Sequence, residues 1–139
     1  MMAQEQQRQC KLFIVEDDPY MVELYSKMVR FDRRFKIVGI AMNGEEAVEK
    51  LEKLQVEENP PDVVIMDHRL PLKTGVEATK EILDFSPKVR IIFASADRGA
   101  REDAFKIGAI NFLQKPFSLR TLFQSILEAF EKDMIAEQN

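Results

Sequence analysis

The sequence predicts an α/β protein in which five strand–helix units form one doubly wound parallel sheet with helices on both faces. Two observations support this fold class. Short apolar runs of strand length alternate along the chain with segments whose apolar residues recur every three or four positions. Most of these runs also end at a polar or charged residue, and the carboxyl ends of parallel strands share one edge of a sheet.

The first half of the chain is predicted to contain two strands and two helices. Residues 12–15 form the first strand, and Asp18 followed by Pro19 is typical of a helix start. Residues 36–41 form the second strand, and Asn43 with a glutamate three positions later begins the next helix. The buried helix faces are predicted at Met21, Leu24, Tyr25, Met28 and Val29, and at Ala47, Val48, Leu51 and Leu54.

The alternation continues through the middle of the chain. Residues 63–66 are uniformly apolar, as expected of a strand buried on both faces. Thr74 and Glu77 have the spacing of a capping box, which predicts the start of the third helix. Pro87 ends that helix, and residues 89–94 form the fourth strand.

A short helix and a regular helix complete the prediction. Asp97 is expected to begin the fourth helix, which ends at Gly108 and has weak apolar periodicity. Residues 110–113 form the fifth strand, and Ser118 is expected to cap the last helix. The apolar residues of these two helices are Ala100, Ala104 and Phe105, followed by Leu119, Leu122, Phe123, Ile126, Leu127 and Phe130.

The 139 residues indicate one domain that is long enough to bury a core. We expect residues 1–9 to be a disordered N-terminal tail, residues 10–131 to form the domain, and residues 132–139 to be a C-terminal tail. The pattern contains no linker to a second domain, so we expect this domain to control another molecule.

Composition argues against several classes of function. A net charge of −4 argues against direct binding to nucleic acid or to an anionic membrane. The single cysteine, Cys10, excludes an internal disulfide, and with only one histidine a His/Cys zinc site is excluded as well. The polar N-terminus differs from a signal peptide, and no apolar stretch approaches the roughly 18 residues of a membrane span. We therefore expect a cytoplasmic protein.

Charged residues at the predicted strand ends indicate a metal site. Glu16 and Asp17 follow the first strand, and Asp67 follows the third, while Lys115 comes after the fifth. Two carboxylates about 4 Å apart repel by about 4 kcal/mol at an effective dielectric constant near 20. Three together need a cation or a proton, and oxygen-only ligands suit Mg²⁺. Each of these residues also has an interpretation without a metal site. The acids could be solvated loop residues, and Lys115 could form a plain salt bridge with them. Ser95, at the end of the fourth strand, could cap the next helix.

The strand-end residues belong to an ordered set of motifs. The motifs are Ile14–Pro19, Met66–Pro71 with Gly75, Ala94–Ala96, and Gly108-Ala109 with Phe112–Phe117. Together they resemble the receiver domain of two-component response regulators, of the single-domain kind related to chemotaxis regulators. The resemblance covers roughly residues 10 to 131 and implies the flavodoxin-like (βα)5 fold with strand order 2-1-3-4-5.

The resemblance implies a phosphoacceptor site that uses Mg²⁺. Asp67 matches the aspartate that accepts a phosphoryl group from a sensor histidine kinase or a phosphotransfer protein. Glu16 and Asp17 match the acid pair that holds Mg²⁺ together with Asp67. The backbone carbonyl of Arg69 matches a further metal ligand.

The resemblance also implies how a signal leaves the site. Lys115 matches the lysine that neutralises phosphoryl oxygens, and Ser95 matches the hydroxyl residue that reads the phosphoryl group. Phe112 matches the aromatic switch on the fifth strand, although a strand phenylalanine is equally often a core residue. The implied protein is a signalling phosphoacceptor rather than an enzyme, and it controls a separate effector protein. A phosphorelay intermediate that passes the phosphoryl group onward is the alternative.

Three competing functions fit the residues less well. A flavodoxin-like cofactor binder needs a phosphate loop after the first strand, where Glu16-Asp17-Asp18 would repel phosphate, and the glycine-rich nucleotide motifs are absent. A phosphatase with an aspartate nucleophile resembles D-x-D, whereas Arg69 occupies that second position. A receiver-like protein that binds partners without phosphorylation would not need the complete set of site residues.

Overall fold

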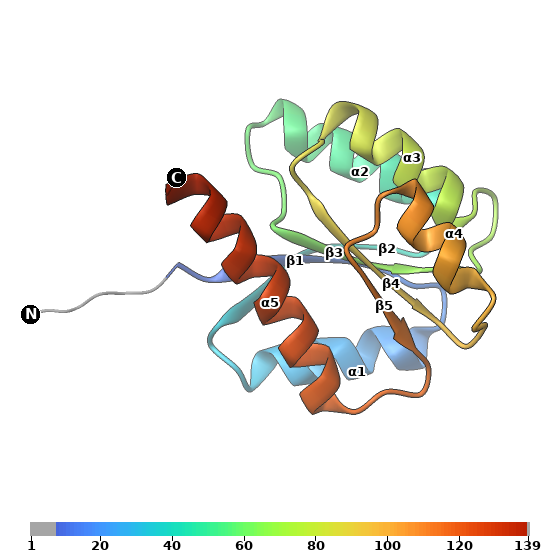
Figure 1. The fold of residues 1–139 in the computed structure, drawn as a ribbon, viewed down its shortest axis with the longest axis horizontal. Coiled ribbons are helices and arrows are strands. Elements are labelled where there is room, and N and C mark those ends of the chain that lie inside the picture. The colour runs from blue at the N-terminus through green and yellow to red at the C-terminus, as the bar shows by residue number, and fades with distance from the viewer. Residues whose placement is uncertain (1–7, 139) are drawn as a thin grey trace, which may run out of the picture.

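The computed structural model describes residues 8–138, and side chains as far as residue 131. Strands and helices alternate through this range, as Figure 1 shows. They are β1 (Cys10–Val15), α1 (Pro19–Arg30), β2 (Phe35–Ala41), α2 (Gly44–Val56), β3 (Val63–Asp67), α3 (Gly75–Phe85), β4 (Arg90–Ser95), α4 (Ala100–Ile107), β5 (Asn111–Gln114) and α5 (Leu119–Gln138). Most of the predicted N-terminal tail, residues 1–9, lies outside the described residues.

The strands form one parallel sheet in the order β2-β1-β3-β4-β5, which confirms the predicted fold class. In its register, Val15 pairs with Met66, and Ser95 pairs with Gln114. The carboxyl ends of these strands therefore lie at one edge of the sheet. Because β1 and β3 are neighbours, the acids that follow β1 lie beside the acid that ends β3.

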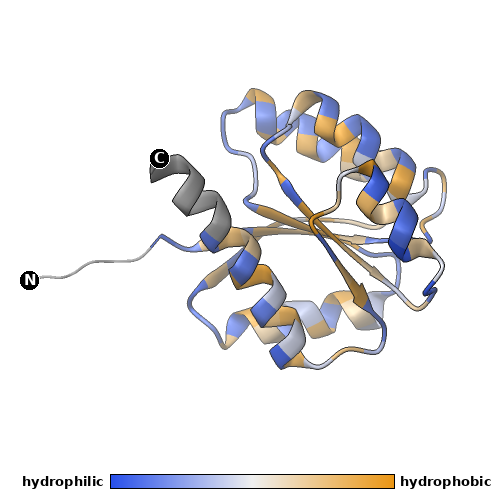
Figure 2. Ribbon diagram, viewed as in Figure 1, coloured by the Kyte–Doolittle hydropathy of each residue, from blue (hydrophilic) through white to orange (hydrophobic). Residues whose placement is uncertain are grey.

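Helices cover both faces of the sheet and divide the core into two parts. In Figure 1, α1 and α5 lie on one face, and α2, α3 and α4 lie on the other. Successive strand residues point to opposite faces, so Phe13 packs beneath α2, α3 and α4 while Ile14 packs beneath α1 and α5. Figure 2 shows the resulting hydrophobic strands, and β3 is buried along its whole length, as the apolar run 63–66 predicts.

Most helices begin at the predicted capping residues. The side chains that accept a hydrogen bond from an amide of the first helical turn are those of Asp18, Asn43, Thr74 and Ser118. The prediction is wrong for the fourth helix, because α4 begins at Ala100 and has no side-chain cap. Asp97 instead accepts a hydrogen bond from the Gly99 amide at 2.8 Å. This short-range bond closes a turn before the helix and keeps the Asp97 carboxylate from capping it.

Three apolar residues that were predicted to face the core are exposed. Leu24, Phe105 and Leu119 keep 47%, 39% and 49% of their surface accessible to solvent. A helix packed on a sheet buries a stripe only about 100° wide. Residues at the margin of that stripe, or in a first helical turn, therefore reach solvent although their spacing is helical.

The last helix, α5, is longer than predicted. It continues to Gln138, through the segment 132–138 that was expected to be a tail. No glycine or proline lies between Pro116 and Gln138, so neither of the two strongest helix-breaking residues interrupts this segment. Among the described residues, no helix is both long enough and apolar enough to cross a membrane.

Candidate functional site

The residues predicted for the site meet in one cleft at the carboxyl edge of the sheet. Glu16 and Asp17 follow β1, Asp67 and Ser95 end β3 and β4, and Lys115 follows β5. The cleft has a volume of about 460 Å³. Its lining includes all six residues that were predicted for phosphoryl transfer and metal binding, namely Glu16, Asp17, Asp67, Arg69, Ser95 and Lys115.

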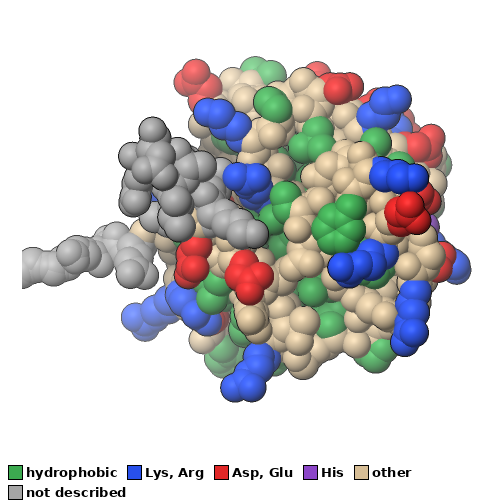
Figure 3. All heavy atoms as spheres, viewed as in Figure 1, with side chains coloured by type: hydrophobic (Ala, Val, Ile, Leu, Met, Phe, Trp, Pro, Cys, Tyr) green, Lys and Arg blue, Asp and Glu red, His purple; other side chains and the backbone are tan. Residues whose placement is uncertain are grey.

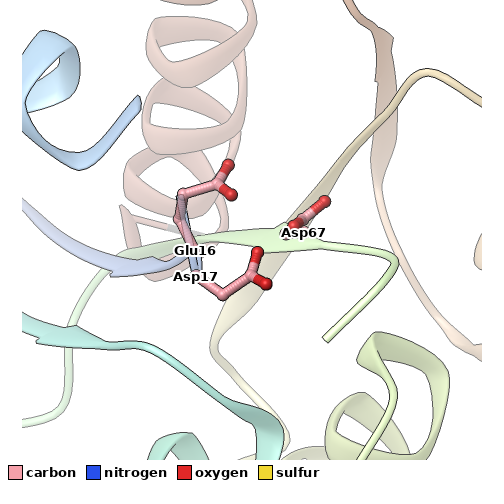
Figure 4. Close-up of side chains that lie close together, drawn as sticks. All are labelled: Glu16, Asp17 and Asp67. Atoms are coloured by element: carbon pink, nitrogen blue, oxygen red, sulfur yellow. The ribbon is translucent and has the colours of Figure 1, made fainter. Parts of the chain in front are cut away.

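Three carboxylates that line this cleft lie close together, as Figure 4 shows. Glu16, Asp17 and Asp67 each offer an oxygen, and these oxygens lie within 4.8 Å of one another. Glu16 and Asp67 are 2% and 8% exposed, whereas Asp17 is open to solvent. Two of the three negative charges are therefore held where water screens them poorly.

Lys115 supplies the positive charge of the cleft. Its Nζ donates to Glu16 Oε1 at 2.8 Å and to Asp67 Oδ1 at 3.4 Å. Burial favours the neutral amine, but the hydrogen bond to Glu16 and the charges of Asp67 and Glu16 outweigh it and raise the pKa of Lys115. Lys115 is therefore an ammonium at neutral pH. Of the two acids, Glu16 is its nearer partner.

The ionised form of Asp67 is disfavoured despite this ammonium. Burial and the negative charge of Glu16 together raise the pKa of the Asp67 carboxyl to about 7, although Lys115 acts in the opposite direction. Without a further cation, Asp67 is partly protonated near neutral pH. A divalent cation in the cleft would favour its carboxylate form.

The donor set fits Mg²⁺. The three acids supply only oxygen ligands, and the exposed position of Asp17 leaves room for the waters that Mg²⁺ retains. No histidine or cysteine lines the cleft, so softer transition metals have no preferred ligand among the lining residues. Arg69 also lines the cleft, and the role of its carbonyl as a metal ligand stays a prediction.

Ser95 links the cleft to the turn that precedes α4. Its side chain is buried, and its Oγ accepts a hydrogen bond from the Asp97 amide at 3.0 Å. The Asp97 carboxylate also lies 3.7 Å from the Arg69 guanidinium. The sequence reasoning assigned no site role to Asp97, although its place two residues after β4 is a signal that points to the cleft.

Phe112 lies apart from the cleft. It is 7% exposed and packs in the core beneath α2, α3 and α4, with its backbone paired to Phe93. In this structure Phe112 is a core residue, in agreement with the alternative interpretation that a phenylalanine on a strand belongs to the core. Its predicted switching role requires a second conformation and stays a prediction.

Asp17→Asn tests the metal assignment. We expect the apparent Kd for Mg²⁺ to rise about tenfold, because the variant keeps an oxygen ligand but loses one charge of the cluster. Isothermal titration calorimetry measures this change. Asp18→Asn is the matched control, since Asp18 also lines the cleft but its carboxylate caps α1 through the Tyr20 amide. Equal Mg²⁺ affinities for Asp17→Asn and the wild type would contradict the assignment.

Comparisons with known proteins agree with the fold. The family model of the response regulator receiver domain matches residues 12–127. A protein-glutamate methylesterase/protein-glutamine glutaminase of Photobacterium profundum is 36% identical over 110 residues, which is 77% of this chain and 27% of that protein. The chain thus spans less than a third of that relative's length.

Two solved structures show the same likeness in three dimensions. The response regulator domain of Thermotoga maritima CheB is 32% identical with a TM-score of 0.74, and the match covers 91% of this chain and 97% of that one. A chain from the CheX-CheY-BeF3-Mg²⁺ complex of Borrelia burgdorferi is 28% identical with a TM-score of 0.76, and the match covers 86% and 88%. With the family model matching most of its length, the chain belongs to the response regulator receiver domain family.

Proposed function

We propose that this chain is a cytoplasmic phosphoacceptor that takes a phosphoryl group onto Asp67 in the presence of Mg²⁺ and then controls a separate effector protein. The phosphoryl donor would be a sensor histidine kinase or a phosphotransfer protein. The observation that carries the proposal is the position of Asp67, which lies in an open cleft with the Lys115 ammonium 3.4 Å from its Oδ1 and two further acids beside it. This arrangement offers a nucleophile, a cation and a set of metal ligands together.

The transfer is a displacement at phosphorus. An ionised Asp67 oxygen attacks the phosphoryl group in line, and a P–O bond forms as the P–N bond to the donor histidine breaks. The bonding electrons return to the imidazole of the donor. Lys115 already contacts Asp67, so its ammonium needs only a small movement to reach the equatorial phosphoryl oxygens.

The acids prepare Asp67 for this attack. Glu16, Asp17 and Asp67 would hold Mg²⁺, together with the Arg69 carbonyl, and the bound ion supplies positive charge to the phosphoryl oxygens. The pKa of Asp67 near 7 means that part of the metal-free population carries a proton on the nucleophile. Metal binding and phosphorylation are therefore expected to depend on each other.

Acetyl phosphate provides the test. The protein is incubated with this small donor with Mg²⁺ and with EDTA, and intact-mass spectrometry follows the addition of one phosphoryl group. We expect stoichiometric, Mg²⁺-dependent labelling. Many turnovers of the donor without a labelled protein would indicate a phosphatase instead, and no labelling with Mg²⁺ would overturn the proposal.

Phosphorylation would change the surface formed by α4, β5 and α5. Ser95 Oγ and the Asp97 carboxylate each hold one amide of the turn that leads into α4, so movement of Ser95 toward a phosphoryl group would alter this turn. The outer face of α4 carries Phe105 between Arg101 and Lys106. Figure 3 shows hydrophobic side chains among Lys and Arg side chains over α4 and β5, a surface suited to a protein partner.

Ser95→Ala separates phosphorylation from the response. We expect the variant to bind Mg²⁺ and beryllofluoride, a phosphoryl mimic, because Asp67 and the acids are unchanged. In the wild type, the amide NMR signals from about residue 95 to residue 117 should shift on binding, whereas in Ser95→Ala the shifts should be confined to the neighbours of Asp67. The idea fails if the variant reproduces the wild-type pattern of shifts.

A further inference from the structure

A glycine lies where two segments meet at the carboxyl edge of the sheet. Gly44 begins α2 without a positive φ, and the side chain of Asn43 caps the helix. A Cβ added to Gly44 would lie 2.7 Å from the carbonyl carbon of Lys73 and nearer still to its carbonyl oxygen. A real Cβ atom does not approach other atoms closer than 3.0 Å. This position therefore requires the absence of a side chain rather than the conformational freedom of glycine.

Lys73 belongs to a loop that carries a predicted metal ligand. This β3–α3 loop, residues 68–74, joins β3 to α3, and its residue Arg69 lines the cleft. The loop is short and is closed at its base, because the Gly75 amide donates to the His68 carbonyl at 3.1 Å. A displacement of the Lys73 backbone is therefore passed along the loop toward Arg69 instead of being absorbed by slack chain.

The segment that leads to Gly44 also contacts the acids after β1. Residues 41–44 connect β2 to α2, and the Ala41 carbonyl accepts a hydrogen bond from the Glu16 amide at 2.9 Å. Because α2 and α3 lie side by side in Figure 1, the first turn of α2 reaches the loop that leads into α3. Residues 41–44 thus lie between the two groups of ligands predicted for the metal, with Glu16 on one side and Lys73 of the β3–α3 loop on the other.

We propose that Gly44 is a positioning residue of the Mg²⁺ site, which sets the spacing between the acid pair and the β3–α3 loop. This inference rests on the proposed function, in which Mg²⁺ is held by both. A methyl group on Gly44 can be accommodated if the loop moves away from α2, and this displaces the Arg69 carbonyl. It can also be accommodated if residues 41–44 move away from the loop, and this displaces the backbone beside Glu16. Either movement weakens the metal site.

Gly44→Ala adds this methyl group, and Gly39→Ala is the matched control. A Cβ on Gly39 would lie 2.5 and 2.7 Å from two ring carbons of Phe13, so the control creates a similar clash in the core, and neither residue lines the cleft. We expect the apparent Kd for Mg²⁺, measured by calorimetry, to rise about tenfold in Gly44→Ala, the lower end of the effect of groups that hold metal ligands in place. Gly39→Ala should keep the wild-type Kd, although both variants should unfold at lower urea concentrations.

Two outcomes of this titration would overturn the inference alone. One is an equal Kd for Gly44→Ala and the wild type. The other is a similar rise in both variants, since general loosening of the fold would then be the cause. Failure of the wild type to bind Mg²⁺ or to be labelled by acetyl phosphate would overturn the proposed function and this inference with it.

The dependence of labelling on Mg²⁺ separates positioning from loss of folded protein. In Gly44→Ala, the Mg²⁺ concentration that gives half the maximal rate of labelling by acetyl phosphate should rise about tenfold. The rate at saturating Mg²⁺ should fall by a smaller factor, because Asp67 and Lys115 are unchanged. A fall by the same factor at low and at saturating Mg²⁺ would contradict a role in metal binding.

The wild type supplies a measurement that does not require a variant to fold. Neither Gly44 nor Lys73 lines the cleft. Even so, we expect the NMR signals of both amides to shift as Mg²⁺ is added, with the midpoint of the calorimetric titration, while the Gly39 amide stays in place. Unmoved Gly44 and Lys73 signals in a protein that binds Mg²⁺ would show that this contact is not coupled to the metal site, and would overturn the inference while leaving the proposed function standing.

Discussion

Asp67→Asn abolishes labelling by acetyl phosphate and, in the metal-free protein at pH 8, raises the free energy of unfolding by about 1–2 kcal/mol. The first effect follows from the loss of the nucleophilic oxygen. The second follows from the removal of one of two buried carboxylates that face each other, Glu16 being the other. Part of this gain in stability is cancelled because the variant also loses the attraction between Asp67 and Lys115, which lie 3.4 Å apart. Intact-mass spectrometry and urea denaturation measure the two effects.

The gain in stability should depend on pH in a defined direction. The pKa of Asp67 is raised from 3.8 to about 7 in the folded protein, so the folded state binds a proton more tightly than the unfolded state between these values. The wild type therefore loses stability as the pH rises through this window, and Asp67→Asn does not. The advantage of the variant should be largest near pH 8 and should shrink toward pH 4. An advantage that is constant from pH 4 to pH 8 would contradict the electrostatic cause.

Asp18→Asn is the control for both effects. Asp18 lines the same cleft, but it is exposed and its side chain caps α1, which asparagine can also do. We expect normal labelling and an unchanged dependence of stability on pH. Full labelling of Asp67→Asn would show that another residue accepts the phosphoryl group.

Lys115→Met is expected to have the largest destabilising effect among the cleft variants. It leaves Glu16 and Asp67 in a buried position without their ammonium, which typically costs about 3–5 kcal/mol. We expect the free energy of unfolding to fall by an amount near the lower end of that range, because Lys115 is itself partly exposed and Asp67 can take up a proton. Labelling by acetyl phosphate should slow by a factor of about 100 or more, since the cation that faces the transferring group is gone.

Mg²⁺ distinguishes this electrostatic effect from simple loss of packing. The ion should stabilise Lys115→Met against urea more than it stabilises the wild type, because it restores positive charge beside the same acids. Lys106→Met serves as the control, since Lys106 forms an exposed pair with Glu102 on α4 and the loss of this pair should change stability little. Equal stabilisation of Lys115→Met and the wild type by Mg²⁺ would point to packing instead.

Much of this architecture is readable from the sequence because it depends on local patterns. The uniformly apolar run 63–66, the capping box of Thr74 and Glu77, and the Gly108 that ends α4 each act within a few residues. Parallel strands share one carboxyl edge, so the sequence alone groups the residues after them into a candidate site. The resemblance to receiver domains then supplied the roles proposed for Asp67, Lys115 and Ser95.

Other properties were decided by the tertiary structure, because they depend on distances between segments that are remote in sequence. The sequence grouped Glu16, Asp67 and Lys115 at strand ends without deciding their pairing, whereas the fold brings Lys115 closer to Glu16, at 2.8 Å, than to Asp67, at 3.4 Å. The raised pKa of Asp67 arises from burial and from Glu16, which follows another strand. Periodicity alone marked Tyr25 as a core residue, and only the fold showed that its hydroxyl is buried without a hydrogen-bond partner among the described residues. Local pattern thus determined the elements and the residues that gather at their ends, while burial and charge after folding decided how those residues pair.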